Sequence, residues 1–195
     1  MVVSIDLQER FGNVERVVYL IGKYGYGRRR LAQKLHSTEM RTRILLNYLA
    51  KEGLIGFSKR GCFLTKKGER IFKKIDSLLG RVERISLKKL SLDKVCVGAL
   101  LKQTRLENSW MVRDEAIRGG ATGAIVLSSV KGKLIMPPSK TQVREYQEDY
   151  YTIKDTLRPS SGDTVVITCA SNIEKALESF WGVVSWILSR NSRKF

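Results

Sequence analysis

The stretch that decides the fold runs from Leu31 to Thr65 and reads LAQKLHSTEMRTRILLNYLAKEGLIGFSKRGCFLT. Its leucines recur at helical spacing on both sides of Ser37 and Thr38, whose side chains can accept hydrogen bonds from the free N–H groups at a helix start. Gly53 then supplies a helix end, and Lys59-Arg60-Gly61 supplies a tight basic turn. We therefore predict a short helix, a turn, a longer helix and two strands joined by a hairpin.

The motifs LAQKL, KEGLI and FLTKKG, at their mutual spacing, resemble the winged helix-turn-helix of many bacterial and archaeal transcriptional regulators. The resemblance covers roughly residues 10 to 80 and implies that the helix from Thr38 to Glu52 enters the major groove of DNA. One position departs from the pattern, because Thr42 stands where such regulators usually place an apolar residue, with Met40 and Ile44 nearby. A helix rotated away from the usual register is therefore an open alternative.

Arg43 and Asn47 are the best candidates for contacts with bases. They lie one turn apart and point away from the core in either rotation, and their side chains can pair bidentately with guanine and adenine. Arg41 either touches a phosphate or pairs with Glu39. The DNA-binding residues that we expect are Arg28, Arg29, Arg30, Ser37, Thr38, Arg41, Arg43, Asn47, Lys59 and Arg60.

The three consecutive arginines, 28 to 30, have two interpretations. Runs of like charge commonly form a solvated surface. In this fold, however, the helix before the recognition helix crosses the DNA backbone, so that arginines at its start would meet phosphates. Tyr24 and Tyr26 beside them either pack against sugars of the nucleic acid or, as we expect, pack in the core or on the surface of the protein.

The positive charge is concentrated in the first half of the chain. The 195 residues carry a formal net charge of +17. Residues 1–90 contain 21 Lys and Arg against 8 Asp and Glu, whereas residues 91–195 contain 15 against 11. The half that resembles a DNA reader is thus the half that attracts a polyanion.

The second half alternates strand and helix patterns. We predict strands over 94–101, 123–128, 133–136 and 163–168, and helices over 108–118 and 171–188, the last one with a capping box at Ser171 and Glu174. Residues 139–158 are polar without clear periodicity. The prediction is an α+β fold: a winged helix-turn-helix domain over 1–90, then a small α+β sandwich over 91–195 with helices on one face of a sheet.

A narrower resemblance covers this second half. The segments WMVRDEAIRGGATGAIVLSSVKGKLIMPP and RPSSGDTVVITCAS are similar to an archaeal family of winged-helix proteins whose C-terminal domain has no assigned biochemistry. The resemblance implies a regulator with an uncharacterised sensor domain. It brings no catalytic residues.

A small-molecule effector site is a candidate in the same half. Polar groups beside an apolar sheet favour such a site, and the candidate effector-binding residues are Arg113, Asp114, Ser160, Ser161 and Asp163. The alternative is structural, with Arg113 in an ion pair to Asp114 or Asp163 and the Ser-Ser-Gly-Asp segment as a turn.

The cysteine pattern indicates neither a disulfide framework nor a metal site. Cys62, Cys96 and Cys169 are far apart and form no CxxC pair, so we expect buried, reduced cysteines. Cys169 precedes a helix, but no histidine follows it to act as a base. We expect a cytoplasmic protein that is not an enzyme and needs no cofactor or metal.

The last helix carries a second apolar stripe, including Val183 and Trp186, which predicts a homodimer suited to a palindromic operator. The sequence therefore predicts a sequence-specific transcriptional regulator that binds double-stranded DNA, pairs through its second half and possesses a possible effector site. The alternative is an RNA- or nucleoprotein-binding module without duplex sequence specificity.

Overall fold

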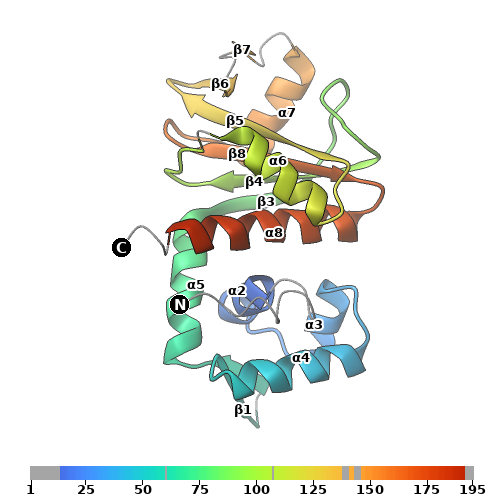
Figure 1. Ribbon diagram of the computed structural model, residues 1–195, viewed down its shortest axis with the longest axis vertical. Helices are drawn as coiled ribbons and strands as arrows, with labels where there is room; N and C mark the ends of the chain where they lie inside the picture. Colours follow the sequence, from blue (N-terminus) through green and yellow to red (C-terminus); the bar gives the residue numbers. More distant parts are fainter. Residues whose placement is uncertain (1–13, 60, 107, 138–140, 143–145, 192–195) are drawn as a thin grey trace. The chain divides into compact units, whose positions relative to one another are not determined.

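A computed structural model describes residues 14–191 apart from 60, 107, 138–140 and 143–145 (Figure 1). The chain divides into two compact units. Among the described residues, the first unit contains residues 14–76 and 188–191, and the second unit is Ser77–Ile187.

The first unit contains the predicted helices and hairpin. Its elements are α2 (Val14–Tyr24), α3 (Arg28–Lys34), α4 (Glu39–Lys51), β1 (Ile55–Ser58), β2 (Gly61–Leu64) and α5 (Lys66–Leu78), whose last two residues belong to the second unit. Strands β1 and β2 are antiparallel, with Ser58 opposite Gly61 at the turn. Buried valines of α2 and leucines of α3 and α4 form one hydrophobic core, to which Leu54 and Ile55 also belong. This arrangement is a winged helix-turn-helix.

The second unit is built on a six-stranded antiparallel sheet with the order β3-β4-β8-β5-β6-β7. The strands are β3 (Leu79–Ile85), β4 (Val95–Leu101), β5 (Gly123–Val130), β6 (Lys133–Met136), β7 (Thr141–Gln142) and β8 (Thr164–Ala170), and the helices are α6 (Ser109–Arg118), α7 (Gln147–Leu157) and α8 (Ile173–Asn191). The chain is therefore α+β, and each strand and helix predicted for this half is present.

Helices cover both faces of the sheet, so the prediction of helices on one face is wrong. Ile153 and Leu157 of α7 pack against a core that includes Val165 and Ile167 of β8. On the opposite face, Ala176 of α8 packs against Val97 and Ala170. All seven residues of β8 are buried, because this central strand has protein on both sides.

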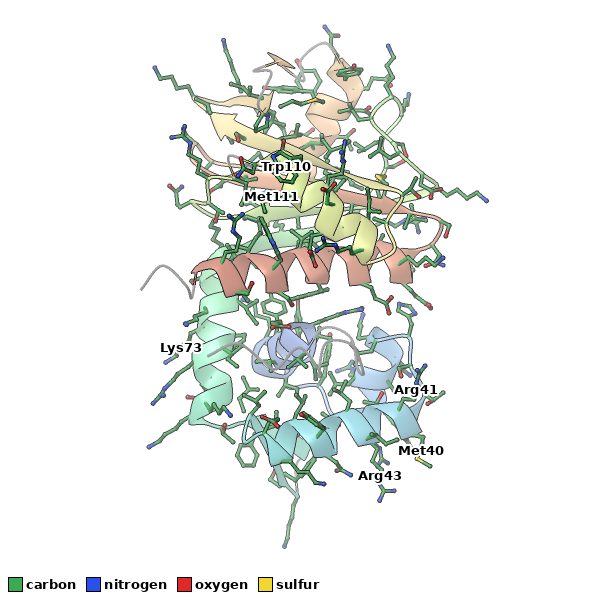
Figure 2. The ribbon with its side chains drawn as sticks, viewed as in Figure 1. Met40, Arg41, Arg43, Lys73, Trp110 and Met111 are labelled. Atoms are coloured by element: carbon green, nitrogen blue, oxygen red, sulfur yellow. A yellow bond between two sulfur atoms is a disulfide. The ribbon has the colours of Figure 1, made fainter. Side chains whose placement is uncertain are left out.

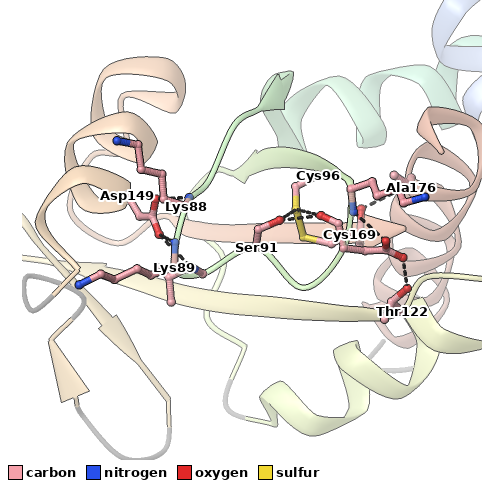
Figure 3. Close-up of a disulfide and its surroundings, with 12 residues drawn as sticks. Lys88, Lys89, Ser91, Cys96, Thr122, Asp149, Cys169 and Ala176 are labelled. Atoms are coloured by element: carbon pink, nitrogen blue, oxygen red, sulfur yellow. Dashed lines mark hydrogen bonds between the residues drawn. A yellow bond between two sulfur atoms is a disulfide. The ribbon is translucent and has the colours of Figure 1, made fainter. Parts of the chain in front are cut away.

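Helix α7 lies in the segment for which the sequence showed no clear periodicity. A buried carboxylate fixes it to the chain before β4. Asp149, only 2% exposed, accepts backbone hydrogen bonds from Lys88 at 2.7 Å, Lys89 at 2.9 Å and Leu90 at 2.7 Å (Figure 3). One side chain thereby orders a connection that has no strand or helix of its own.

The boundary between the two units differs from the one expected near Ser91. Strand β3 pairs antiparallel with β4, from Ile85 opposite Cys96 to Leu79 opposite Leu101. Residues 79–85 are therefore the edge of the second unit's sheet. A short amphipathic strand directly after a helix gave no composition change that would have marked this boundary.

Cys96 and Cys169 form a disulfide, which corrects the expectation of reduced cysteines (Figure 3). They stand directly opposite each other on β4 and β8, and their Cα atoms are 4.1 Å apart. The pairing depends on the register of two strands separated by 73 residues, which spacing along the sequence does not disclose. Cys169 consequently offers no thiolate nucleophile in this state.

Two expectations for helix α8 are also corrected. The side chain of Asn172, rather than Ser171, accepts a hydrogen bond from a backbone N–H at the helix start, that of Lys175 at 2.9 Å. Val183 is fully buried and Trp186 is half-buried. The second apolar stripe of α8 is therefore not an exposed surface.

Candidate nucleic-acid interface

Helix α4 has one buried face and one exposed face. Leu45, Leu46 and Leu49 enter the core, and Thr42 lies among them with 1% of its surface exposed. The opposite face contains Arg43 and Asn47, both exposed as the sequence predicts. The helix is therefore oriented with Thr42 inward, which resolves the question of its rotation.

Two large apolar side chains lie on the exposed face of α4 as well. Met40 is 68% exposed and Ile44 is 48% exposed. Figure 2 shows Met40, Arg41 and Arg43 projecting outward from α4. A face that combines cations, an amide and apolar side chains presents the groups that read base edges in a major groove.

Thr38 is the N-cap residue of α4, and its hydroxyl is used for this cap. Its hydroxyl accepts a hydrogen bond from the Arg41 backbone N–H at 3.2 Å, as an N-cap residue does. Ser37 is half-buried in the turn, and its backbone N–H donates to the Ala32 carbonyl at 2.9 Å. Both residues shape the turn between α3 and α4.

The arginines at the start of α3 are tied to α4 through one acid. The Nε atoms of Arg28 and Arg29 each lie 3.4 Å from a carboxylate oxygen of Glu39. Because these side chains are half or more exposed, the ion pairs contribute little to stability. Among the described residues Glu39 therefore pairs with α3 and not with Arg41.

Arg30 takes part in an aromatic stack. Its guanidinium lies 5.5 Å from the centre of the Tyr26 ring, which in turn stacks on Tyr24 with centroids 5.0 Å apart. The two tyrosines stack on each other at the surface, where Tyr24 is 54% exposed and Tyr26 is half-buried. Since the three arginines remain exposed, a phosphate can still reach them.

The hairpin turn supplies Lys59 as an exposed cation. The Ser58 hydroxyl donates to the Gly61 carbonyl at 3.2 Å and closes the turn, and Gly61 has a φ of 120°, a conformation that glycine adopts without strain. Arg60, the other predicted wing cation, lies outside the described residues.

Thr65 and its neighbours fix the wing to α4, a role that the sequence reasoning missed. The Thr65 hydroxyl donates to the Gly53 carbonyl at 2.6 Å and accepts from the Gly68 N–H at 3.2 Å. A Cβ on Gly68 would lie 2.1 Å from the Leu54 carbonyl oxygen, so only glycine permits this close approach. The signal was present as a Thr-x-x-Gly spacing at the start of α5.

Cys62 is half-buried on the wing and is the free cysteine among the described residues. Burial raises the pKa of its thiol, which donates to the Tyr26 carbonyl at 3.4 Å. A protonated thiol with a partner is a poor nucleophile. Its role is to join β2 to the loop before α3.

The structure does not bring the predicted effector residues together as one site. Arg113 and Asp114 are adjacent on α6 and form an exposed ion pair at 3.7 Å. Asp163 is 5% exposed and accepts from the backbone N–H groups of Gln103 at 2.9 Å and Ser160 at 2.8 Å. The Ser161 hydroxyl accepts from the Lys131 N–H at 3.2 Å. Residues 160–163 therefore form an ordered turn.

A cavity of about 670 Å³ lies beside that turn. Asp163 lines it, whereas Arg113 and Asp114 do not. Thr104, Arg105, Leu106, Ser128, Ser129, Val130, Ile135, Pro137, Gly162 and Thr164 complete the lining. The size is within the range of small-molecule sites.

Within the part of the chain that the structure describes, no group of three or more His, Cys, Asp or Glu side chains is placed to hold a metal ion. No described helix is long and apolar enough to span a membrane.

The fold of the first unit defines a winged helix-turn-helix protein, a class in which the helix at the position of α4 commonly contacts DNA. Residues 7–79 match the family described as the CggR N-terminal DNA binding domain. Residues 92–187 match a second family, described as a domain of unknown function (DUF4443). Together these similarities indicate a DNA-binding, regulator-like protein.

A solved structure of a hypothetical protein from Pyrococcus horikoshii OT3 shares the fold over nearly the whole length. The two proteins are 28% identical, 92% of each chain is covered, and the TM-score is 0.70. No curated protein matches this chain.

Proposed function

We propose that this protein is a sequence-specific transcriptional regulator that reads duplex DNA in the major groove through helix α4. The observation that carries the proposal is the exposed face of α4, where Arg43 and Asn47 stand clear of the core. Arg pairs bidentately with guanine and Asn with adenine, so this pair can specify bases. The similarity of the first unit to a DNA-binding family supports the same assignment.

Cations around α4 supply the contacts that carry no sequence information. Arg28, Arg29 and Arg30 at the start of α3 and Lys59 at the wing are exposed on elements that flank the recognition helix in this fold. Each phosphate contact releases condensed counterions, so affinity falls as salt rises. We place this activity in the cytoplasm, and the neighbour from Pyrococcus horikoshii supports an archaeal family.

The test is selection of genomic fragments by the full-length chain, followed by titration of the enriched duplex across salt concentrations. Arg43→Ala and Asn47→Ala should each lower discrimination between the enriched site and a scrambled duplex by about 1–3 kcal/mol, the usual contribution of a bidentate base contact. Arg84→Ala is the matched control for the loss of charge. Arg84 is an exposed arginine on β3, so this substitution removes one positive charge away from α4.

Uniform, salt-sensitive binding that both variants retain would contradict the proposal. That result would mean that the basic first unit grips only the backbone. Structured RNA and nucleoprotein would then be the partners to examine, since the same charge attracts them.

We further propose that two copies pair through the second unit. Val183 is buried, so the outer face of α6 is the better candidate: Trp110 is 58% exposed and Ile117, two turns later, is 47% exposed. Between them stand one cation and one anion, Arg113 and Asp114. In a two-fold interface Arg113 of one copy would face Asp114 of the second copy, and Asp114 would face Arg113. The surface is therefore self-complementary.

The cavity beside residues 160–163 is our proposed effector site, in place of a site at Arg113. An effector alters DNA affinity only if it binds the two states of the regulator unequally. The test is a thermal-shift screen of small carboxylic acids and amines against the full chain, with Ser128→Trp to fill the cavity. A compound that stabilises both proteins equally would contradict this location.

A further inference from the structure

The exposed apolar residues of α4 carry an inference that rests on the proposed function and deepens it. Successive helical residues are rotated by ~100° about the axis. Met40, Ile44 and Asn47 therefore share the centre of the exposed face, while Thr42 lies at the centre of the buried face. Arg41 and Arg43 stand on opposite sides of this central group.

Near its start, α4 is oriented against the hydrophobicity of its own residues, because a polar side chain faces the core and apolar side chains face solvent. The helix buries Thr42, whose hydroxyl has no hydrogen-bond partner among the described residues, and it exposes Met40 and Ile44. An unpaired buried hydroxyl is unfavourable, and two large apolar side chains in water forgo a favourable burial. This cost is explained if Met40 and Ile44 contact a partner molecule.

The charged side chains around Met40 and Ile44 indicate which kind of partner these two residues contact. Arg41, Arg43 and Lys51 are exposed on the same helix, whereas Glu39 is paired with Arg28 and Arg29. The surroundings thus suit a polyanion rather than an apolar protein surface. In the major groove of duplex DNA the apolar group at a base edge is the 5-methyl group of thymine.

We infer that Met40 and Ile44 are specificity-determining residues that contact thymine 5-methyl groups in the site. Asn47 lies about one turn after Ile44 on the same face and suits an adenine. The half-site therefore contains thymines next to an adenine under the face that Met40, Ile44 and Asn47 form. Residues at the start of a recognition helix are those that reach base edges.

The experiment replaces each thymine of the enriched duplex, one at a time, with deoxyuridine. This change removes the methyl group and leaves the hydrogen-bonding edge intact. Transfer of one methylene-sized group out of water changes an equilibrium constant about fourfold. The full-length chain should lose about that factor at two or more thymines in each half-site, and almost nothing at the others.

Variants assign each methyl group to a side chain. Ile44→Ala should bind the thymine and deoxyuridine duplexes equally at one position, and Met40→Ala should do so at another. Leu92→Ala is the matched control, because Leu92 is 46% exposed in the second unit and its truncation removes the same number of carbon atoms as Ile44→Ala. It should discriminate as the unchanged chain does.

The outcomes separate this inference from the proposed function. A chain that prefers its enriched duplex over a scrambled one, but binds every deoxyuridine duplex as tightly as the thymine duplex, overturns the methyl contacts and leaves sequence-specific reading intact. A chain that enriches no motif overturns both. Because the deoxyuridine series uses the unchanged protein, failure of a variant to fold cannot mask the result.

Discussion

Thr42 holds a hydroxyl in the core of the first unit at 1% exposure without a hydrogen-bond partner among the described residues. Thr42→Val keeps the shape of the side chain and removes the unsatisfied group. We expect the variant to be more stable by about 1 kcal/mol. Urea unfolding followed by far-ultraviolet circular dichroism measures the change.

DNA affinity serves as the control for Thr42→Val. Thr42 faces inward, so the exposed face of α4 is unchanged and binding should be the same. A variant less stable than the unchanged chain would mean that the hydroxyl has a partner, such as a buried water. The prediction would then be wrong.

Single residues were predictable where the local pattern determines them. The exposure of Arg43 and Asn47 follows from helical periodicity, and Thr38 caps α4 because its position directly precedes the helix. The partner of Glu39 was not predictable, since it depends on how α3 and α4 cross. The start of α8 was missed by one residue because Asn172, next to Ser171, is an equally good cap.

At the scale of elements, Asp149 fixes α7 to residues 88–90 with three backbone hydrogen bonds. Asp149→Asn keeps the volume, but its amide nitrogen cannot accept from an N–H. We expect the free energy of unfolding to fall by about 2–3 kcal/mol, because hydrogen bonds to a charged acceptor are strong and a buried N–H is left unpaired. Asp155→Asn, at an exposed position of the same helix, is the matched control.

Tryptophan fluorescence in urea is the measurement for this prediction. Trp110, Trp181 and Trp186 all belong to the second unit, so their signal follows its unfolding. Equal midpoints for Asp149→Asn and Asp155→Asn would contradict the role given to the buried carboxylate.

The Cys96–Cys169 disulfide joins β4 and β8, two neighbouring interior strands of the sheet. A cross-link stabilises by restricting the unfolded chain, by about 2–4 kcal/mol in typical cases. The double variant with Cys96→Ser and Cys169→Ser should lose stability in that range in the same fluorescence assay. Cys62→Ser is the control for loss of a thiol, and reductant should lower only the stability of chains that retain the disulfide.

Elements with a strong period were predictable, and those defined by distant partners were not. The alternating or continuous apolar runs of β4, β5, β6 and β8 marked these strands. Helix α7 was missed because its buried side includes Asp149, whose partners lie about sixty residues earlier. The edge strand β3 and the disulfide likewise depend on sheet register, which a single sequence does not display.

At the scale of the whole molecule, a homodimer matters because a two-fold protein reads two half-sites in opposite orientation. Sedimentation at tens of micromolar should give the mass of two chains. Trp110→Ala should shift the protein toward the monomer, since exposed aromatic residues dominate the energy of such interfaces. Tyr151→Ala is the matched control, because Tyr151 is also 58% exposed and belongs to the same unit.

The charged pair on α6 gives a sharper test of the same surface. In a two-fold interface Arg113 faces Asp114 of the partner subunit, so Arg113→Asp places like charges together and should weaken the dimer. Exchanging both residues, Arg113→Asp with Asp114→Arg, restores opposite charges across the axis and should recover pairing. If the dimer persists in both Arg113→Asp and Trp110→Ala, the two copies pair through another surface. If the unchanged chain is itself a monomer, the dimer proposal is wrong and each half-site is bound by a separate chain.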